Sequence, residues 1–213
     1  MPGRRVRGQT RGCQNRDVEN RSGLAPLARA LARRPGAPDE SVPADRKAAV
    51  AAILRERPGK VELLFIRRAE HPRDPWSGHM GLPGGRVEPA AATPLEAALR
   101  ETLEEIGLDL AALGRPLGRL SEVRTHLPLG SVPHSVVPFA FSVEGDPPLT
   151  PNEEVQEALW VPFSFLSDRR NRSSFTWVRK GLPLPMPCLR YEGRVIWGLT
   201  LRIVDELVSV AEG

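Results

Sequence analysis

The order of elements along this chain predicts an α+β fold of the α/β/α sandwich type. Two strand-like segments, 47–54 and 61–67, are joined by a turn at 57–60. One helix with clear end signals follows at 93–107, and further strands and a closing helix come after it. Strand segments on both sides of a single central helix favour a layered fold over a helical bundle.

The region before residue 44 differs in composition from the rest. Residues 1–22 are rich in Arg, Gly and Asn and lack an apolar face, which is typical of a disordered basic tail. Residues 23–43 predict a short helix and then a linker with three prolines. We expect the main domain at 44–213, with the apolar positions of the short helix packed on it. Those positions are Leu24, Leu27, Ala28 and Leu31.

The central helix has signals for both of its ends in the local sequence. Thr93 suits the N-cap, Pro94 suits the first helical position, and Glu96 completes a capping box. Gly107 is a natural C-cap. Six residues at helical spacing are expected to pack inward, namely Leu95, Ala98, Leu99, Thr102, Leu103 and Ile106.

The segments after this helix alternate between strand patterns and turns. We expect paired strands at 116–125 and 132–143, a strand at 158–162, a short helix or turn at 164–170, an irregular stretch at 183–187 and a hairpin at 189–196. The closing helix carries its apolar face on Leu199, Ile203, Leu207 and Val210.

Charge and composition exclude several classes of function. The net charge of +4 arises in residues 1–34, which hold nine arginines and two acidic residues, whereas the remainder is net negative. The tail lacks interleaved aromatic residues, so we expect no nucleic-acid partner. No apolar run is long enough to span a bilayer. Cys13 and Cys188 show no disulfide or metal pattern, and we read both as reduced thiols of a cytoplasmic protein.

The charged face of the central helix is unusual. Glu101, Glu104 and Glu105 stand at helical positions i, i+3 and i+4, so their carboxylates lie on one side and repel each other. Clustered carboxylates suit a hard cation such as Mg²⁺ or Mn²⁺. A solvated face is the simpler interpretation of such a cluster. A capped helix directly after a Pro-Gly-Gly turn, with Arg100 beside the cluster, favours the metal site.

Residues 100–108, RETLEEIGL, together with the preceding glycine pair at 84–85, resemble the signature of the Nudix hydrolases. The resemblance covers residues 45–165. It implies a mixed sheet between helices and metal-assisted hydrolysis of a nucleoside diphosphate linked to another group. Two positions depart from the signature, because Thr102 replaces an aliphatic residue and Ala92 replaces an acidic one.

The same resemblance implies roles for the charged residues. Glu101 and Glu105 would bind Mg²⁺ or Mn²⁺, and Glu104 would be a ligand or the base that activates water. Arg100 would hold these glutamates by ion pairing, with an ordinary helix salt bridge as the alternative. Glu154 would reach the metal from a loop, with a surface carboxylate as the alternative.

A narrower resemblance is to the coenzyme A-cleaving Nudix proteins. Their upstream motif is matched at 63–67 (LLFIR) and at 78–85 (GHMGLPGG), although Arg68 stands where a small residue is usual. The segment 194–200, RVIWGLT, matches outside the catalytic core. This resemblance implies cleavage of coenzyme A or acyl-coenzyme A to phosphopantetheine and 3′,5′-ADP.

Four residues are candidates for substrate binding. Arg67 and Arg73 have planar guanidinium groups that suit phosphate, although in an arginine-rich chain any single one is more often a surface residue. Gly84 and Gly85 permit close approach of a ligand to the backbone. His79 is a weaker candidate for a base or supporting group, because a lone histidine seldom has a functional role.

Three functions stay open on the sequence alone. The first is a coenzyme A diphosphatase, for which the resemblance also allows a homodimer. The second is a Nudix hydrolase of ADP-ribose, NADH or a nucleotide sugar, because the upstream motif is imperfect. The third is a non-catalytic nucleotide-binding domain, because Ala92 departs from the signature. An intact set of three glutamates argues against the third.

Overall fold

The computed structural model describes residues 23–33, 36–70, 77–88, 93–125, 135–179 and 181–213. Its larger sheet is mixed, because β1 pairs with β7 in parallel and with β2 antiparallel. The strands are β1 (Lys47–Arg57), β2 (Lys60–Arg68), β3 (Met80–Gly81), β4 (Gly84–Arg86), β5 (Arg115–Arg119), β6 (Val123–Arg124), β7 (Ser135–Val143) and β8 (Val155–Pro162). Their order is β3-β2-β1-β7-β5, with β4 on β1, β6 on β7 and β8 on β2.

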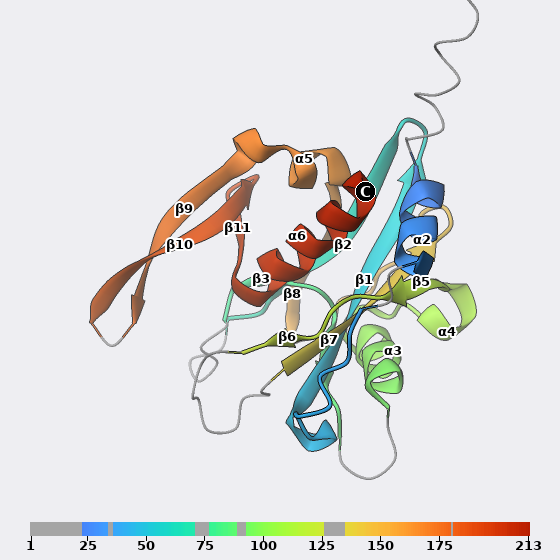
Figure 1. Ribbon diagram of the computed structural model, residues 1–213, viewed down its shortest axis with the longest axis horizontal. Coiled ribbons are helices and arrows are strands. Elements are labelled where there is room, and N and C mark those ends of the chain that lie inside the picture. Colours follow the sequence, from blue (N-terminus) through green and yellow to red (C-terminus); the bar gives the residue numbers. More distant parts are fainter. Residues whose placement is uncertain (1–22, 34–35, 71–76, 89–92, 126–134, 180) are drawn as a thin grey trace, which may run out of the picture.

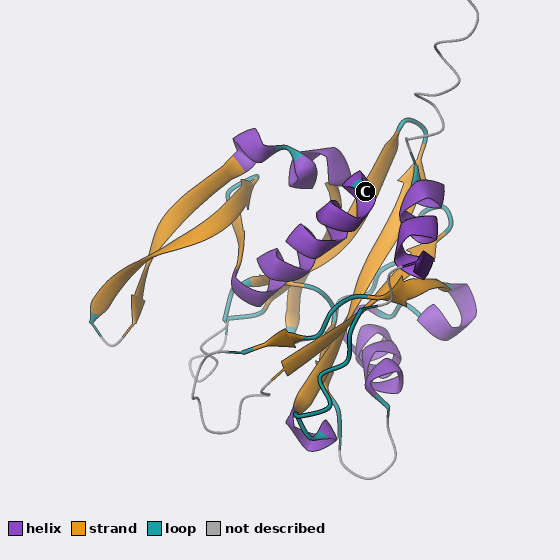
Figure 2. Ribbon diagram, viewed as in Figure 1, coloured by secondary structure: helices purple, strands orange, loops and turns teal. Residues whose placement is uncertain are grey.

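Helices cover both faces of this sheet (Figures 1 and 2). Leu63 and Phe65 of β2 share a buried cluster with the helices of one face, and Leu64 and Ile66 share another with those of the opposite face. This alternation follows from the two-residue period of a strand. The helices are α2 (Leu24–Arg33) and α6 (Gly198–Glu212) on one face and α3 (Pro94–Ile106) and α4 (Leu110–Leu113) on the other; the short helices η1 (Ala44–Arg46), α5 (Phe163–Ser167) and η2 (Arg169–Asn171) lie in connections. The predicted α+β sandwich is confirmed.

A smaller sheet extends the fold beside α6. It consists of β9 (Arg172–Arg179), β10 (Leu182–Tyr191) and β11 (Arg194–Trp197), with β10 in the middle. The β9–β10 hairpin projects from the body of the molecule, at the left of Figure 1. The expected irregular stretch at 183–187 is wrong, because it forms part of β10. Proline is tolerated in a strand where the chain does not need to donate a hydrogen bond to its neighbour.

The segment before β1 is attached to the domain through packing and polar contacts. Leu27 and Leu31 of α2 are 3% and 1% exposed, and both belong to the core shared with α6. The helix expected at this position is therefore confirmed, whereas the domain boundaries at 22 and 44 stay predictions. Among the described residues, no helix is long and apolar enough to cross a membrane.

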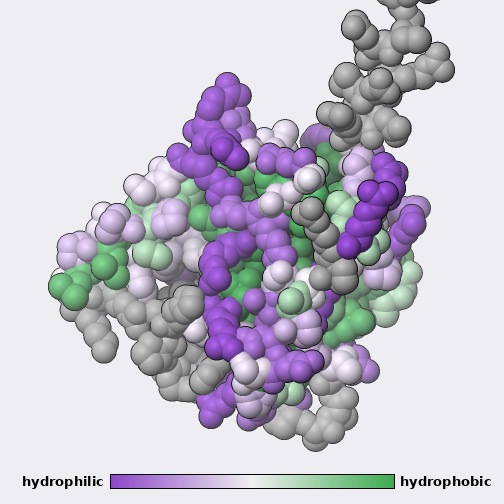
Figure 3. Space-filling model, in the orientation of Figure 1, coloured by the Kyte–Doolittle hydropathy of each residue, from purple (hydrophilic) through white to green (hydrophobic). Residues whose placement is uncertain are grey.

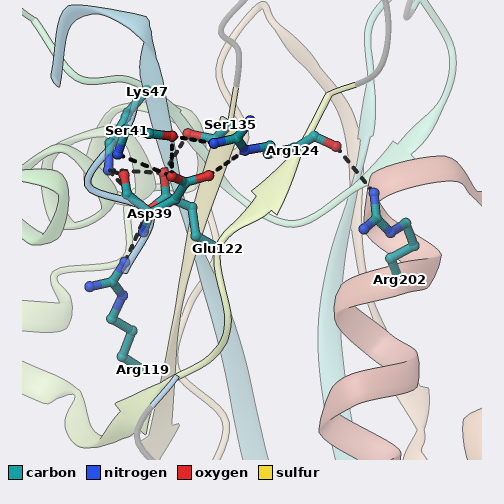
Figure 4. A network of polar contacts seen from close by, with 8 residues as sticks. All are labelled: Asp39, Ser41, Lys47, Arg119, Glu122, Arg124, Ser135 and Arg202. Atoms are coloured by element: carbon teal, nitrogen blue, oxygen red, sulfur yellow. Dashed lines mark hydrogen bonds and ion pairs between the residues drawn. The ribbon is translucent and has the colours of Figure 1, made fainter. Parts of the chain in front are cut away.

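A polar network around Glu122 fixes the next segment, 36–42 (Figure 4). The Glu122 carboxylate accepts hydrogen bonds from Lys47 Nζ at 3.0 Å, the backbone N–H of Asp39 at 2.8 Å and Ser135 Oγ at 2.5 Å. Burial opposes its ionisation, but these bonds together hold the pKa of Glu122 below its ordinary value. The network joins the start of β1 to β7 and is structural.

Candidate active site

Helix α3 is held at both ends as its sequence predicts. The backbone N–H of Glu96 donates to Thr93 Oγ1 at 3.2 Å, and the Glu96 carboxylate accepts from the Thr93 N–H at 2.7 Å. Gly107 ends the helix with a positive φ of 68°, and its N–H donates to the Leu103 carbonyl at 2.9 Å. The helix is therefore a rigid support for the side chains along it.

The buried face of α3 is narrower than predicted. Ala98, Thr102 and Ile106 are fully buried, as expected, but Leu95 and Leu103 are 39% and 48% exposed. The prediction that these two leucines pack inward is wrong. The residues that face the sheet include Ala97 and Glu105 instead, so the helix is rotated toward its carboxylate side. This rotation brings a glutamate into the interior.

Glu105 is the buried member of the acidic cluster. Its side chain lies beneath the glycine turn, where the backbone N–H of Gly84 donates to Glu105 Oε2 at 2.9 Å, and the residue is 3% exposed. Burial, with a smaller contribution from the nearby charges of Glu101 and Glu154, raises the pKa of Glu105 to about 7. The hydrogen bond from Gly84 and the charge of Arg68 oppose this rise. A cation placed among these carboxylates would remove that electrostatic cost.

Glu101 lies against the second glycine of the turn. A Cβ added to Gly85 would fall 2.4 Å from the carboxylate carbon of Glu101, so any larger residue here would force this carboxylate to move. Burial also raises the pKa of Glu101, although its ion pair with Arg100 opposes the shift. The glycine pair is therefore matched to the glutamates, one contacting Glu105 and the other Glu101.

Arg100 binds the two more exposed glutamates of the helix. Its Nη2 lies 2.7 Å from Glu101 Oε1, and its Nη1 lies 2.9 Å from Glu104 Oε2. The Glu104 side chain is 53% exposed, so it lies at the outer rim of the cluster. The expected ion pairing of Arg100 is present in this form. It fixes the orientation of both Glu101 and Glu104.

The loop before β8 brings Glu154 to the same end of the sheet. The backbone N–H groups of Thr150 and Asn152 donate to the last carbonyls of α3, at Ile106 and Glu105, with distances of 2.7 and 2.9 Å. The Glu154 charge lies near enough to raise the pKa of both Glu101 and Glu105. The loop thus places a fourth carboxylate beside the cluster.

This donor set fits a hard divalent cation chemically. All four groups are carboxylates, which Mg²⁺ and Mn²⁺ prefer as ligands, and burial raises the pKa of two of them, Glu101 and Glu105. Within the described parts of the chain, no three acidic, histidine or cysteine side chains are gathered closely enough to enclose a metal ion. Binding would require a side-chain rotation.

A pocket of about 290 Å³ lies on the opposite face of the end of β2. Arg67 lines this pocket, whereas the positive charge of the next residue, Arg68, lowers the pKa of Glu105. His79 and Trp197 also line it, with ring centroids 5.1 Å apart. The pocket and the carboxylates are therefore separated by the width of one strand.

Among the predicted site residues, the charged residues of α3, the glycine pair and Glu154 lie at one site, whereas Arg67 lines the separate pocket. Arg73 and Ala92 lie outside the described residues. Arg68 was not predicted as a site residue. Its position after Arg67 in a strand that ends at the glutamates is the signal that sequence reasoning could have used.

The comparison with known proteins decides the family. The family model of the NUDIX domain matches residues 45–179. The chain belongs to the Nudix hydrolases. It is 30% identical over 166 residues to the uncharacterized Nudix hydrolase NudL of Yersinia pestis, and this match covers 78% of the chain and 79% of the relative. NudL of Yersinia pseudotuberculosis matches to the same extent.

Solved structures of the family are also similar. A MutT/nudix family protein from Enterococcus faecalis is 16% identical, with a TM-score of 0.48, and the match covers 96% of this chain and 74% of that one. A MutT protein from Methanosarcina mazei is 26% identical, with a TM-score of 0.43, and the match covers 56% and 78%. The family membership makes this Nudix protein a pyrophosphohydrolase that acts on a nucleoside diphosphate derivative. Enzymes of this family generally use divalent metal ions.

Proposed function

We propose that this Nudix hydrolase cleaves the pyrophosphate bond of coenzyme A or acyl-coenzyme A, releasing 3′,5′-ADP together with phosphopantetheine or its S-acyl derivative. One observation carries the proposal. Three stretches that resemble coenzyme A-cleaving Nudix proteins are far apart in the chain, yet all contribute to one pocket. They supply Arg67 from 63–67, Gly78 and His79 from 78–85, and Arg194 and Trp197 from 194–200.

The chain offers separate groups for the metal and the substrate. Glu101 and Glu105 would hold the ion, Glu104 would serve as a further ligand or as the base, and Glu154 would approach from its loop. A bound Mg²⁺ or Mn²⁺ would polarise the phosphoryl oxygens and lower the pKa of an attacking water. Arg100 would keep Glu101 in position.

Arg67 is the described guanidinium best placed to bind a substrate phosphate in the pocket. Its Nη1 and Nη2 are 3.9 and 4.0 Å from Glu157 and Glu70, so neither carboxylate forms a close bidentate pair with it. Arg194, in contrast, contacts both oxygens of Glu157 at 2.6 Å. Arg67 would therefore contact the substrate, and Arg194 would shape the wall. Gly84 and Gly85 would admit the diphosphate close to the backbone.

A second candidate is hydrolysis of another nucleoside diphosphate derivative, such as ADP-ribose or NADH. The observation that favours it is Arg68, which occupies the small-residue position of the coenzyme A motif and lies beside Glu105. The guanidinium group of Arg68 would suit the diphosphate of any of these substrates. Selectivity between them must therefore come from the pocket on the other face of β2.

A substrate panel tests the proposal. Coenzyme A, acetyl-coenzyme A, ADP-ribose and NADH are compared with Mg²⁺ and with Mn²⁺, and products are identified by mass. Preference for the coenzyme A compounds with release of 3′,5′-ADP is expected, and preference for ADP-ribose or NADH would contradict it. Glu101→Gln should lower turnover by about a hundredfold or more, because the metal loses a ligand. Wild-type turnover in that variant would remove Glu101 from the metal site.

A further inference from the structure

The small sheet has two chemically different faces. Residues paired directly across strands share a face, and β10 pairs Leu182 with Arg179, Leu184 with Trp177 and Met186 with Phe175. One face of the hairpin therefore carries large apolar side chains along its length. We call it the apolar face and define it by Phe175, Trp177, Leu182, Leu184 and Met186. The opposite face carries Ser174, Thr176, Val178, Pro183, Pro185 and Pro187.

The apolar face runs without interruption into the pocket beside Arg67. Cys188 pairs with Trp197, so Trp197 continues the same face onto β11. Its ring lies 5.0 Å from that of Phe175 and 5.3 Å from that of Trp177, measured between centroids. Phe175 and Trp197 both line the pocket. A ligand that fills the pocket would therefore meet an apolar path leading outward along the hairpin.

The outer part of this face is exposed and narrow. Leu182 is 67% exposed and Leu184 is 39% exposed, and hydrophobic colour gathers at the outer end of the hairpin in Figure 3. Stable protein interfaces bury roughly 800 Å² on each partner, which two exposed leucines on a two-stranded arm do not supply. A single hydrocarbon chain has the width of such a face and gains free energy by covering it.

The polar end of this path is next to the catalytic carboxylates. Arg67 lines the pocket, and Arg68, one residue later, acts on Glu105 from the other face of the strand. Consecutive Cα atoms are about 3.8 Å apart. The pocket and the glutamates are therefore the width of one strand apart, and the proposed substrate would extend from the glutamates to the pocket and on along the hairpin.

We infer that the apolar face binds the acyl chain of an acylated substrate. The inference rests on the proposed function, and it deepens it by naming the preferred substrate as acyl-coenzyme A with a chain of about ten carbons or more rather than free coenzyme A. The diphosphate lies at Glu101 and Glu105, the linking arm fills the pocket between Arg67 and Trp197, and the hydrocarbon covers Leu184 and Leu182.

Selectivity between two substrates tests this inference. The ratio of kcat/KM for decanoyl-coenzyme A to that for coenzyme A is measured for the wild type, for the double variant Leu182→Gln/Leu184→Gln and for Val178→Gln. Glutamine adds no charge that would repel an anionic substrate. Val178 is 63% exposed on the opposite face of the same hairpin, so its variant is a matched control. The wild type should favour the acylated substrate, and the double variant should lower the ratio about tenfold through lost apolar contact.

A second measurement keeps the two proposals separable. Binding of S-decanoyl pantetheine, which has no pyrophosphate, is followed by tryptophan fluorescence in the same proteins. We expect binding by the wild type and by Val178→Gln, and weaker binding by the double variant. If the wild type hydrolyses neither coenzyme A compound, the proposed function fails, while this binding assay still decides the role of the face.

Three outcomes would overturn the inference. The first is an equal kcat/KM for both substrates in the wild type together with no binding of S-decanoyl pantetheine. The second is an equal loss of selectivity in Val178→Gln and in the double variant. The third is conversion of a wild-type dimer to a monomer by Leu182→Gln/Leu184→Gln in sedimentation, which would assign the face to a second copy of the chain.

Discussion

Replacing Glu105 by Gln should change how the stability of the metal-free protein depends on pH. In the wild type, burial raises the pKa of Glu105 from 4.5 to about 7. The folded protein therefore holds this proton more tightly than the unfolded chain does. As the pH rises from about 4.5 to about 7, the unfolded chain ionises first, and stability falls. The Gln variant has no proton to lose at this position, so this part of the pH dependence should disappear.

The size of the effect follows from the pKa shift. One pKa unit corresponds to about 1.36 kcal/mol, so the shift of Glu105 corresponds to about 3 kcal/mol of stability lost above pH 7. The residue is 3% exposed, and solvent screening therefore removes little of this figure. For a chain of this size, each kcal/mol changes the unfolding midpoint by about 2–4 °C.

Urea unfolding followed by tryptophan fluorescence provides the assay. Both proteins are measured with a chelator at pH 5, 6, 7 and 8, and the difference between their free energies of unfolding is plotted against pH. That difference should change by about 3 kcal/mol in favour of the variant as the pH rises. Added Mn²⁺ should stabilise the wild type more than the variant. If the free energies of unfolding of the wild type and the variant changed with pH in parallel in the presence of the chelator, Glu105 would not be the buried, uncompensated carboxylate.

Three further substitutions test other parts of the structure. Gly85→Ala should lower turnover about tenfold or more, because the new Cβ would fall 2.4 Å from the carboxylate carbon of Glu101, and unchanged metal-dependent turnover would contradict this contact. Arg55→Ala should destabilise by about 1.5–3 kcal/mol in urea, because Glu62, which is 3% exposed, loses its partner at 2.7 Å but keeps Lys60 at 2.6 Å, and a loss below 1 kcal/mol would show that the Arg55 pair is not needed. Leu31→Ala should cost about 2–5 kcal/mol by the same assay, and a neutral result would separate α2 from the cooperative core.

The parts of the fold that sequence predicts well are those encoded locally. The capping box at Thr93 and Glu96 and the left-handed Gly107 are properties of short segments, and the structure contains both. The strands at 47–54 and 61–67 are also found, because their apolar runs are buried on both faces of the larger sheet.

The parts that failed depend on tertiary contacts. Helical spacing cannot tell how wide the buried face of α3 is, and so it placed Leu95 and Leu103 inside. Strand β9 was missed, and residues 183–187 of β10 were interpreted as irregular, because their prolines conceal a register that only the pairing with β9 shows. For the site, the chain positions of the glutamates were evident, but the burial of Glu105 beneath Gly84 was not. The roles of the site residues stay predictions.

The three alternating prolines of β10 have a consequence for how the molecule behaves in a crowded solution. A projecting hairpin ordinarily offers an open edge on which another chain can add a strand. Pro183, Pro185 and Pro187 lack the N–H groups that such an added strand would need along this edge. The arm can therefore expose leucines on its face while resisting the addition of a strand at the β10 edge. Apolar contact on the face does not have to lead to strand pairing at that edge.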